Sequence, residues 1–129
     1  MENDIWSDFA CPYCYAGMKK FRRALNIEVN YRSFQLNPSL KHGDYPDFIG
    51  LLADSYMVSR EKAIGMIEKS VAFVNAEGLV YDYEKMVPAN TLDAHRLTYY
   101  AKDFQKDTLL SDRLFKAHFA EGLDLGNRD

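Results

Sequence analysis

The spacing of apolar residues divides the first third of the chain into a strand, a helix and a second strand. Residues 4–9 hold a short apolar segment that predicts a buried strand, with Trp6 and Phe9 in the core. Apolar side chains recur every three or four positions over residues 12–25, which predicts a helix. Residues 27–34 alternate between apolar and polar positions, which predicts a strand. Because a helix joins the two strands, we expect them to pair in parallel.

Beyond this unit the pattern is almost wholly helical. Turn residues occupy 35–45, and four helices are predicted to follow, over residues 46–57, 59 to 75 or 77, 90 or 91 to about 104, and 107–121. Ser59 is a suitable N-cap, and Gly78 and Gly122 are suitable helix ends. The chain is therefore predicted to be α/β, with a β-α-β part over residues 1–36 and a helical part over residues 37–129.

Composition narrows the classes of function. The chain has 129 residues and a formal net charge of −3. One domain is the default at this length, and the acidic balance argues against nucleic acid as a partner. Neither a secretory signal pattern nor an apolar run long enough to cross a membrane is visible, so we expect a cytoplasmic protein that does not bind membranes.

The candidate chemistry lies in Cys11-Pro12-Tyr13-Cys14, which holds the only two cysteines. The motif comes directly after the first predicted strand and opens the first helix, where a thiol pair can form a reversible redox couple. A thiolate at Cys11 would face the free amides of Tyr13 and Cys14, which predicts a pKa below the usual ~8.5. Cys11 is then the attacking sulfur and Cys14 the resolving one, while Pro12 and Tyr13 tune the pair.

Two other interpretations of the cysteines stay open. They could be buried structural residues, or they could be half of a zinc site. Structural zinc takes four ligands, and the three histidines, His42, His95 and His118, stand singly and far apart in the sequence. We therefore predict no metal, and we expect His95 and His118 to be hydrogen-bonded structural residues of their helices.

Four segments, in order along the chain, resemble the DsbA-family thiol-disulfide oxidoreductases, and specifically their FrnE-like branch. They are Trp6–Gly17 (WSDFACPYCYAG), Phe34–Pro38 (FQLNP), Pro88–Leu97 (PANTLDAHRL) and Leu114–Gly122 (LFKAHFAEG). The resemblance implies a thioredoxin-like fold with a helical insert after the second strand. It also implies that the chain exchanges disulfides with protein or low-molecular-weight thiols, with Cys11 as nucleophile and Cys14 as resolving residue.

The resemblance also suggests residues that support the site. Asp8 lies three positions before Cys11, either as a turn residue or in thiol proton transfer. Asn90, His95 and Arg96 lie on the part of the insert that could cover the cysteines and contact a substrate. No cofactor is expected, although glutathione could serve as a co-substrate.

The same family predicts what this chain lacks. Its members return from the insert to the thioredoxin core with a cis-proline, a β-hairpin and a last helix, and this chain is expected to lack that hairpin and helix. The unpaired strand edges that remain would favour a homodimer or a domain swap. An inactive domain that self-associates is therefore one alternative.

A second alternative is a glutathione-dependent transferase or isomerase of the kappa or hydroxychromene-carboxylate isomerase type. Those relatives generally carry a serine at the first position of the motif. The presence of both Cys11 and Cys14 favours dithiol exchange.

Overall fold

The predicted β-α-β unit is present in the fold of the protein, a computed structural model that describes residues 3–26 and 28–129. Strand β1 (Asp4–Ser7) pairs in parallel with β2 (Asn30–Ser33), and α1 (Pro12–Leu25) joins them. Both strands are shorter than predicted, and residue 27, the first of the predicted second strand, lies outside the described residues. The parallel order is confirmed.

Four helices follow, as the sequence pattern predicts. They are α2 (Phe48–Tyr56), α3 (Arg60–Asn75), α4 (Leu92–Lys102) and α5 (Asp107–Phe119). The Ser59 side chain accepts a hydrogen bond from the Lys62 amide, which confirms Ser59 as the N-cap of α3. Gly78 and Gly122 both adopt positive φ beyond the helix ends. Within the described part of the chain, none of these helices is long and apolar enough to cross a membrane.

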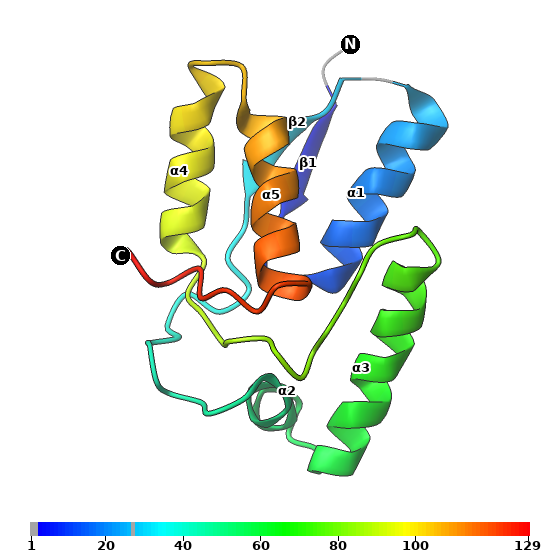
Figure 1. Ribbon diagram of the computed structural model, residues 1–129, viewed down its shortest axis with the longest axis vertical. Coiled ribbons are helices and arrows are strands. Elements are labelled where there is room, and N and C mark those ends of the chain that lie inside the picture. The colour runs from blue at the N-terminus through cyan, green and yellow to red at the C-terminus, as the bar shows by residue number, and fades with distance from the viewer. Residues whose placement is uncertain (1–2, 27) are drawn as a thin grey trace.

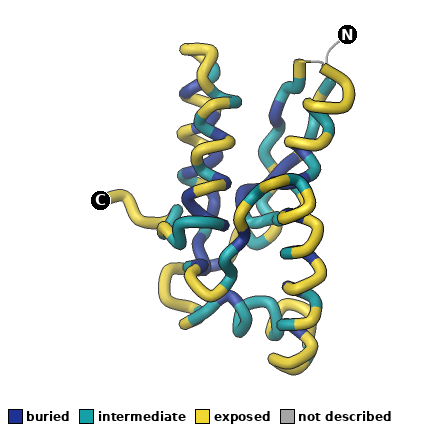
Figure 2. The backbone as a smooth tube through the Cα atoms, turned by 45° about the vertical axis from the view of Figure 1, so that its right-hand side comes forward, coloured by how far each residue is buried: buried dark blue, intermediate teal, exposed yellow. Residues whose placement is uncertain are grey.

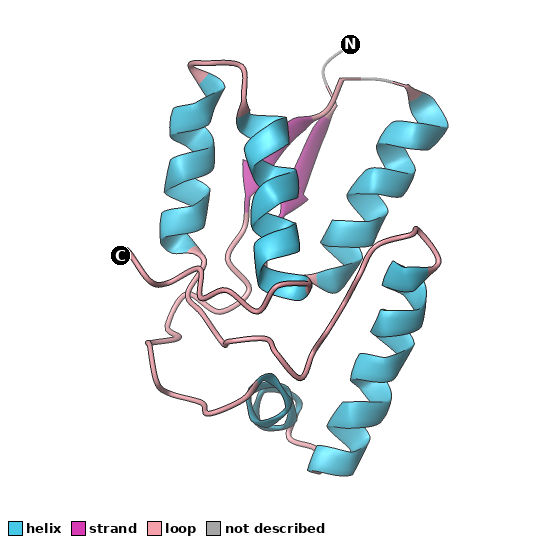
Figure 3. Cartoon of the chain, viewed as in Figure 1, coloured by secondary structure: helices cyan, strands magenta, loops and turns pink. Residues whose placement is uncertain are grey.

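Helices α3 and α5 pack directly on α1 of the β-α-β unit (Figures 1 and 3). Helix α3 contacts both α1 and α2, while α5 contacts α4 and α1. One hydrophobic cluster contains residues from both predicted parts of the chain, among them Phe9, Phe48 and Phe115. The mixed α/β class with a small sheet and a helical insert is therefore confirmed, and the boundary at residue 36 stays a prediction.

The core is built on stacked aromatic rings. Phe119 is fully buried at the end of α5, with its ring centroid 5.3 Å from that of Tyr15 and 5.0 Å from that of Tyr81. Tyr15 also stacks on Phe115 at 5.2 Å. Buried positions gather between the elements, and exposed positions follow the outer helix faces (Figure 2). These rings hold α1 and α5 together beside the cysteine motif, since offset stacking adds to the gain from apolar burial.

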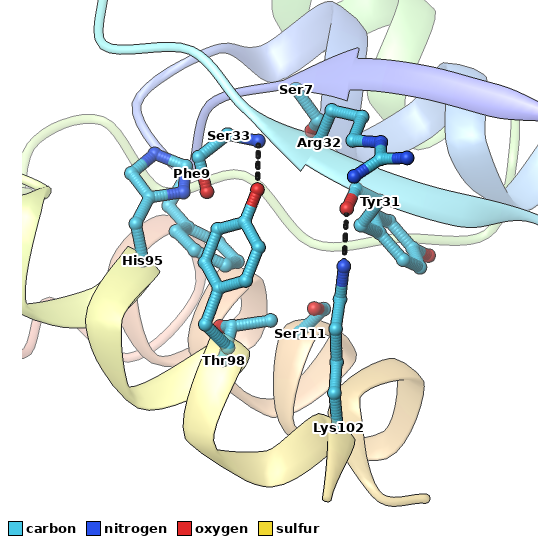
Figure 4. A pocket seen from close by; sticks show the side chains of 10 residues that line it. Ser7, Phe9, Tyr31, Arg32, Ser33, His95, Thr98, Lys102 and Ser111 are labelled. Carbon is cyan, nitrogen blue, oxygen red and sulfur yellow. Dashed lines mark hydrogen bonds between the residues drawn. The ribbon is translucent and has the colours of Figure 1, made fainter.

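Side chains of α4 cover the outer edge of β2. The Ser33 amide lies 3.4 Å from the Tyr99 hydroxyl, to which it donates a hydrogen bond. The Lys102 ammonium donates to the Tyr31 carbonyl at 2.9 Å (Figure 4). The same ammonium lies over the Tyr99 ring. An uncovered strand edge offers its backbone groups to other chains, and these two side chains occupy that edge.

Trp6 corrects the sequence-based prediction. Phe9 is buried as expected, but Trp6 is 67% exposed. Its neighbour Ser7 and Tyr31 of β2 are buried and line a small space against α4 and α5. Because side chains alternate between the faces of a strand, Trp6 points away from the face that the helices cover.

Replacement of Gly122 with alanine is expected to lower the free energy of unfolding by about 1–3 kcal/mol. Gly122 has a φ of 67°, and an added Cβ would lie 2.6 Å from the Lys85 carbonyl oxygen. Gly43→Ala is the matched control, because Gly43 also has positive φ but has open space around it. Urea denaturation at neutral pH measures both. An equal loss in the two variants would show that the contact with Lys85 contributes nothing.

Candidate active site

Cys11 is the N-cap of α1. Its backbone is extended (φ −98°, ψ 114°), and Pro12 is the first residue of the helix. Proline is favoured there because its missing N–H would have no partner in the helix. The Cys14 amide donates to the Cys11 sulfur at 3.4 Å, and both cysteines are free thiols. The motif therefore places one sulfur at the positive end of a helix dipole and the other one turn away.

The two thiols ionise as a pair. A hydrogen bond between them lowers the pKa of Cys14 to about 6 and raises the pKa of Cys11. The amides of Cys14 and Tyr13 favour a thiolate on Cys11, but the bond between the thiols has the larger effect. The sequence predicts the lowered pKa for Cys11, whereas in the structure it falls on Cys14. One proton is thus shared between two adjacent sulfurs, and either can carry the charge.

Access distinguishes the two sulfurs. Cys11 lines a groove of about 660 Å³ between the motif and helices α2 and α3, whereas Cys14 packs against the hydrophobic cluster. The groove is mainly apolar, and its lining includes Pro12, Tyr13, Leu36, Phe48, Leu52, Tyr56, Met66 and Tyr81. A reactant would therefore meet Cys11 first.

Asp8 lies behind the cysteine motif and is only 3% exposed. One of its carboxylate oxygens accepts from the Thr91 hydroxyl at 2.7 Å and lies 3.0 Å from His95 Nε2. The other oxygen accepts from the Leu36 amide at 2.8 Å, and the Asp8 carbonyl accepts from the Cys11 amide at 3.1 Å. Asp8 is therefore far more than a turn residue, since it joins β1, the loop after β2, and α4.

These partners set the ionisation of Asp8. Burial would raise the pKa of its carboxyl group, but the hydrogen bonds from His95, the Leu36 amide and Thr91 together hold that pKa below its usual value. The carboxylate is therefore charged at neutral pH. Its negative charge in turn acts to raise the pKa of Cys14, while the Asp8 amide and the Ser7 hydroxyl act to lower it. Asp8 is thus an electrostatic neighbour of the thiol pair.

The three residues of the insert that were predicted to contact a substrate do not line the groove beside Cys11. Asn90 donates to the carbonyls of Pro38 and Leu40 and accepts from Gln35 and from the Leu92 amide, so its amide group is fully used. His95 is 6% exposed and bound to Asp8. Arg96 is exposed and pairs with Asp93 at 3.4 Å. None of the three lines the groove beside Cys11, and their contact with a substrate stays a prediction.

Two neighbours of the site were not predicted from the sequence. The sequence leaves Asn90 and Thr91 as alternative caps of α4; in the structure the Thr91 hydroxyl binds Asp8, and Asn90 accepts from the Leu92 amide. His118 was expected to be hydrogen-bonded, yet neither of its ring nitrogens has a partner among the described residues. Its only sequence signal was a histidine inside an apolar helix pattern. In the described part of the chain, no group of three or more His, Cys, Asp or Glu side chains is arranged to hold a metal ion.

Comparison with known proteins places this site in a family. The family model of the DSBA-like thioredoxin domain matches residues 4–129, nearly the whole chain. The chain belongs to the DsbA-like thioredoxin domain family. The fold that surrounds the cysteine motif of this DsbA-like chain is therefore the one that the sequence resemblance implied.

Two longer proteins are similar to this DsbA-like chain. A crystal structure of a probable DsbA oxidoreductase from Streptomyces coelicolor superimposes with a TM-score of 0.85 and 33% identity, over 99% of this chain and 56% of that one. The uncharacterized protein YwbO of Bacillus subtilis (strain 168) is 24% identical over 97% of this chain and 60% of its own length. The chain thus spans less than two thirds of either relative.

Proposed function

We propose that this chain carries the dithiol centre of a thiol-disulfide oxidoreductase of the FrnE-like branch. The observation that supports this most strongly is the placement of Cys11. Its sulfur accepts the Cys14 amide at the start of α1 and lines an apolar groove, within a chain of the DsbA-like family. Such a sulfur is accessible, and the amides at the start of the helix favour its thiolate form.

The proposed reaction proceeds in two exchanges. The Cys11 thiolate attacks a substrate disulfide, which forms a Cys11–substrate S–S bond and releases the first substrate thiolate. The Cys14 thiolate then attacks the Cys11 sulfur, which forms the Cys11–Cys14 bond and releases the second substrate thiolate. The substrate gains two electrons and the protein loses two, and the protons of the cysteines pass to the released thiolates. Run in reverse, the same steps oxidise a substrate dithiol or reshuffle its bonds.

The proposal includes the setting of the reaction. Its substrates are protein or low-molecular-weight thiols and disulfides in the cytoplasm, with no metal or other cofactor. The proposal also includes a homodimer or a domain swap that forms through the unpaired edge of the sheet. The apolar groove supports substrates with apolar side chains next to the reacting sulfur, because such a lining gains from burying them.

Reduction of insulin disulfides by dithiothreitol tests the activity. The protein should accelerate the reaction, and Cys11→Ser should reduce the rate to that of dithiothreitol alone. A Cys11→Ser variant that still accelerates insulin reduction would overturn the assignment. Retention of a glutathione-dependent activity in that variant would instead support the transferase or isomerase alternative, in which glutathione is a co-substrate. Equal thermal unfolding of the two proteins serves as the control for folding.

A further inference from the structure

A small cavity lies between Asp8 and helix α5. Its volume is about 40 Å³, and its lining includes Asp8, Asn37, Leu40, Thr91 and His118. A cavity needs roughly 10–15 Å³ of such space to hold a water molecule, together with polar partners on its walls. This cavity therefore has room for at least one water, and its lining includes polar side chains.

His118 supplies the polar group on the side of α5. The residue is 2% exposed, and both of its ring nitrogens lack a hydrogen-bond partner among the described residues. Burial lowers its pKa to about 4, although the charges of Asp8 and Asp124 oppose this. The ring is therefore neutral at pH 7, with one donor and one acceptor to satisfy. Buried polar groups in folded proteins are almost always paired with protein or with ordered water.

Asp8 is a second polar residue in the lining of the cavity. A carboxylate can accept about four hydrogen bonds. Among the described residues three are made, by Thr91, His95 and the Leu36 amide, which leaves one acceptor position there. Because Asp8 also lines the cavity, that position can be filled from within it.

We propose that this cavity is a hydration site, in which water bound between His118 and Asp8 completes the hydrogen bonds of both side chains. His118 is then a positioning residue that acts on the cysteines through Asp8. Water on the carboxylate screens its negative charge, and so reduces its opposition to the Cys14 thiolate. Only the effect on disulfide exchange rests on the proposed function, since the hydration site and the thiol ionisation do not depend on turnover.

Other charged groups also lie near Asp8 and His118 and could change the ionisation of the thiols. His95 on α4 faces the same Asp8 oxygen as Thr91, and the charge of Asp124 acts on His118 from the C-terminal segment. Asp124 itself pairs with His42 at 3.2 Å. A change made at His118 leaves these partners in place, so a shift in thiol ionisation would report on the cavity.

The first test is the pH dependence of thiolate absorbance at 240 nm in the full chain. In His118→Phe, an apolar ring replaces the donor and acceptor, and the first thiol midpoint should rise by on the order of one pH unit. His118→Gln keeps a donor and an acceptor and should lie closer to the wild type. His42→Gln is the matched control, because His42 is exposed. The thiol midpoint of this variant should be the same as that of the wild type. An unchanged midpoint in folded His118→Phe would overturn the positioning role.

The second test observes the water directly and needs no variant. Nuclear Overhauser contacts between the His118 ring and a long-lived water, or an ordered water between His118 and Asp8 in a crystal structure, would support the proposal, and a dry cavity would overturn it. This test also decides the case in which His118→Phe does not fold. If the wild type shows the water but does not accelerate insulin reduction, the proposed function is refuted and the hydration site is not.

Discussion

Replacement of Asp8 with alanine is expected to lower the free energy of unfolding by about 3–5 kcal/mol at neutral pH. The substitution removes the acceptor of two buried donors, the Thr91 hydroxyl and His95 Nε2, and of the part-buried Leu36 amide. The Thr91 and His95 donors would stay buried without a partner, and the cost of this exceeds the net gain from one hydrogen bond. Urea denaturation of the two proteins measures the difference.

The loss should depend on pH in a defined direction. The pKa of Asp8 is lower in the folded protein than the usual value near 3.8. The stabilisation by its ionised form is therefore fully present above that value, and it disappears as pH falls through the folded pKa. The difference between wild type and Asp8→Ala should accordingly shrink below about pH 4.

A matched control separates burial from charge. Asp93 also has a lowered pKa, held by Arg128 and Arg96, but it lies at the surface. Asp93→Ala should change stability only slightly, because solvent screens such pairs. Similar losses in Asp8→Ala and Asp93→Ala would contradict the role assigned to the buried network.

Replacement of Cys14 with alanine is expected to stop the reaction at the mixed disulfide. Cys11 keeps its place at the helix start and on the groove, so it can still attack a substrate disulfide. The adduct has no second thiol to release it and should accumulate to one substrate molecule per chain. Intact mass under non-reducing conditions measures the adduct after incubation with a peptide disulfide.

Cys11→Ala is the matched control for trapping. It retains the Cys14 thiol, but that sulfur packs against the hydrophobic cluster and does not line the groove. This variant should form little adduct in the same time. If Cys11→Ala traps substrate as readily as Cys14→Ala, the order of attack proposed for the two cysteines is wrong.

The local features of the fold could be predicted because their causes are local. The N-cap at Ser59, the proline at the start of α1 and the strand-helix-strand order all follow from short-range sequence patterns. Trp6 was misplaced because burial of a strand residue depends on which face of the sheet is covered, and alternation alone does not reveal that. The place of the cysteine motif at the start of α1 could be predicted from its spacing and position, but the prediction of Cys11 as the thiol with the lowered pKa was wrong, because that pKa depends on the hydrogen bond between the two thiols.

The polar surroundings of the site could not be predicted in the same way. Asp8 and Thr91 are 83 positions apart, and each also fits a local role as a turn residue or a helix cap. Asn90 and Thr91 both had the side chain to cap α4, and the choice was set by the buried carboxylate that Thr91 binds. Long-range hydrogen bonds of this kind depend on how distant segments pack, which one sequence does not encode in any periodic pattern.

Because α4 covers the outer edge of β2, a further strand can pair with the sheet on one side only. Tyr99 and Lys102 already occupy backbone groups on the outer edge of β2, whereas among the described residues β1 has no strand on its other side. An added strand from any source could therefore extend the sheet only beside β1. In hydrogen exchange, the Ser33 amide should be slow even though no strand lies next to it, and the Trp6 amide should become slow only when a further strand binds.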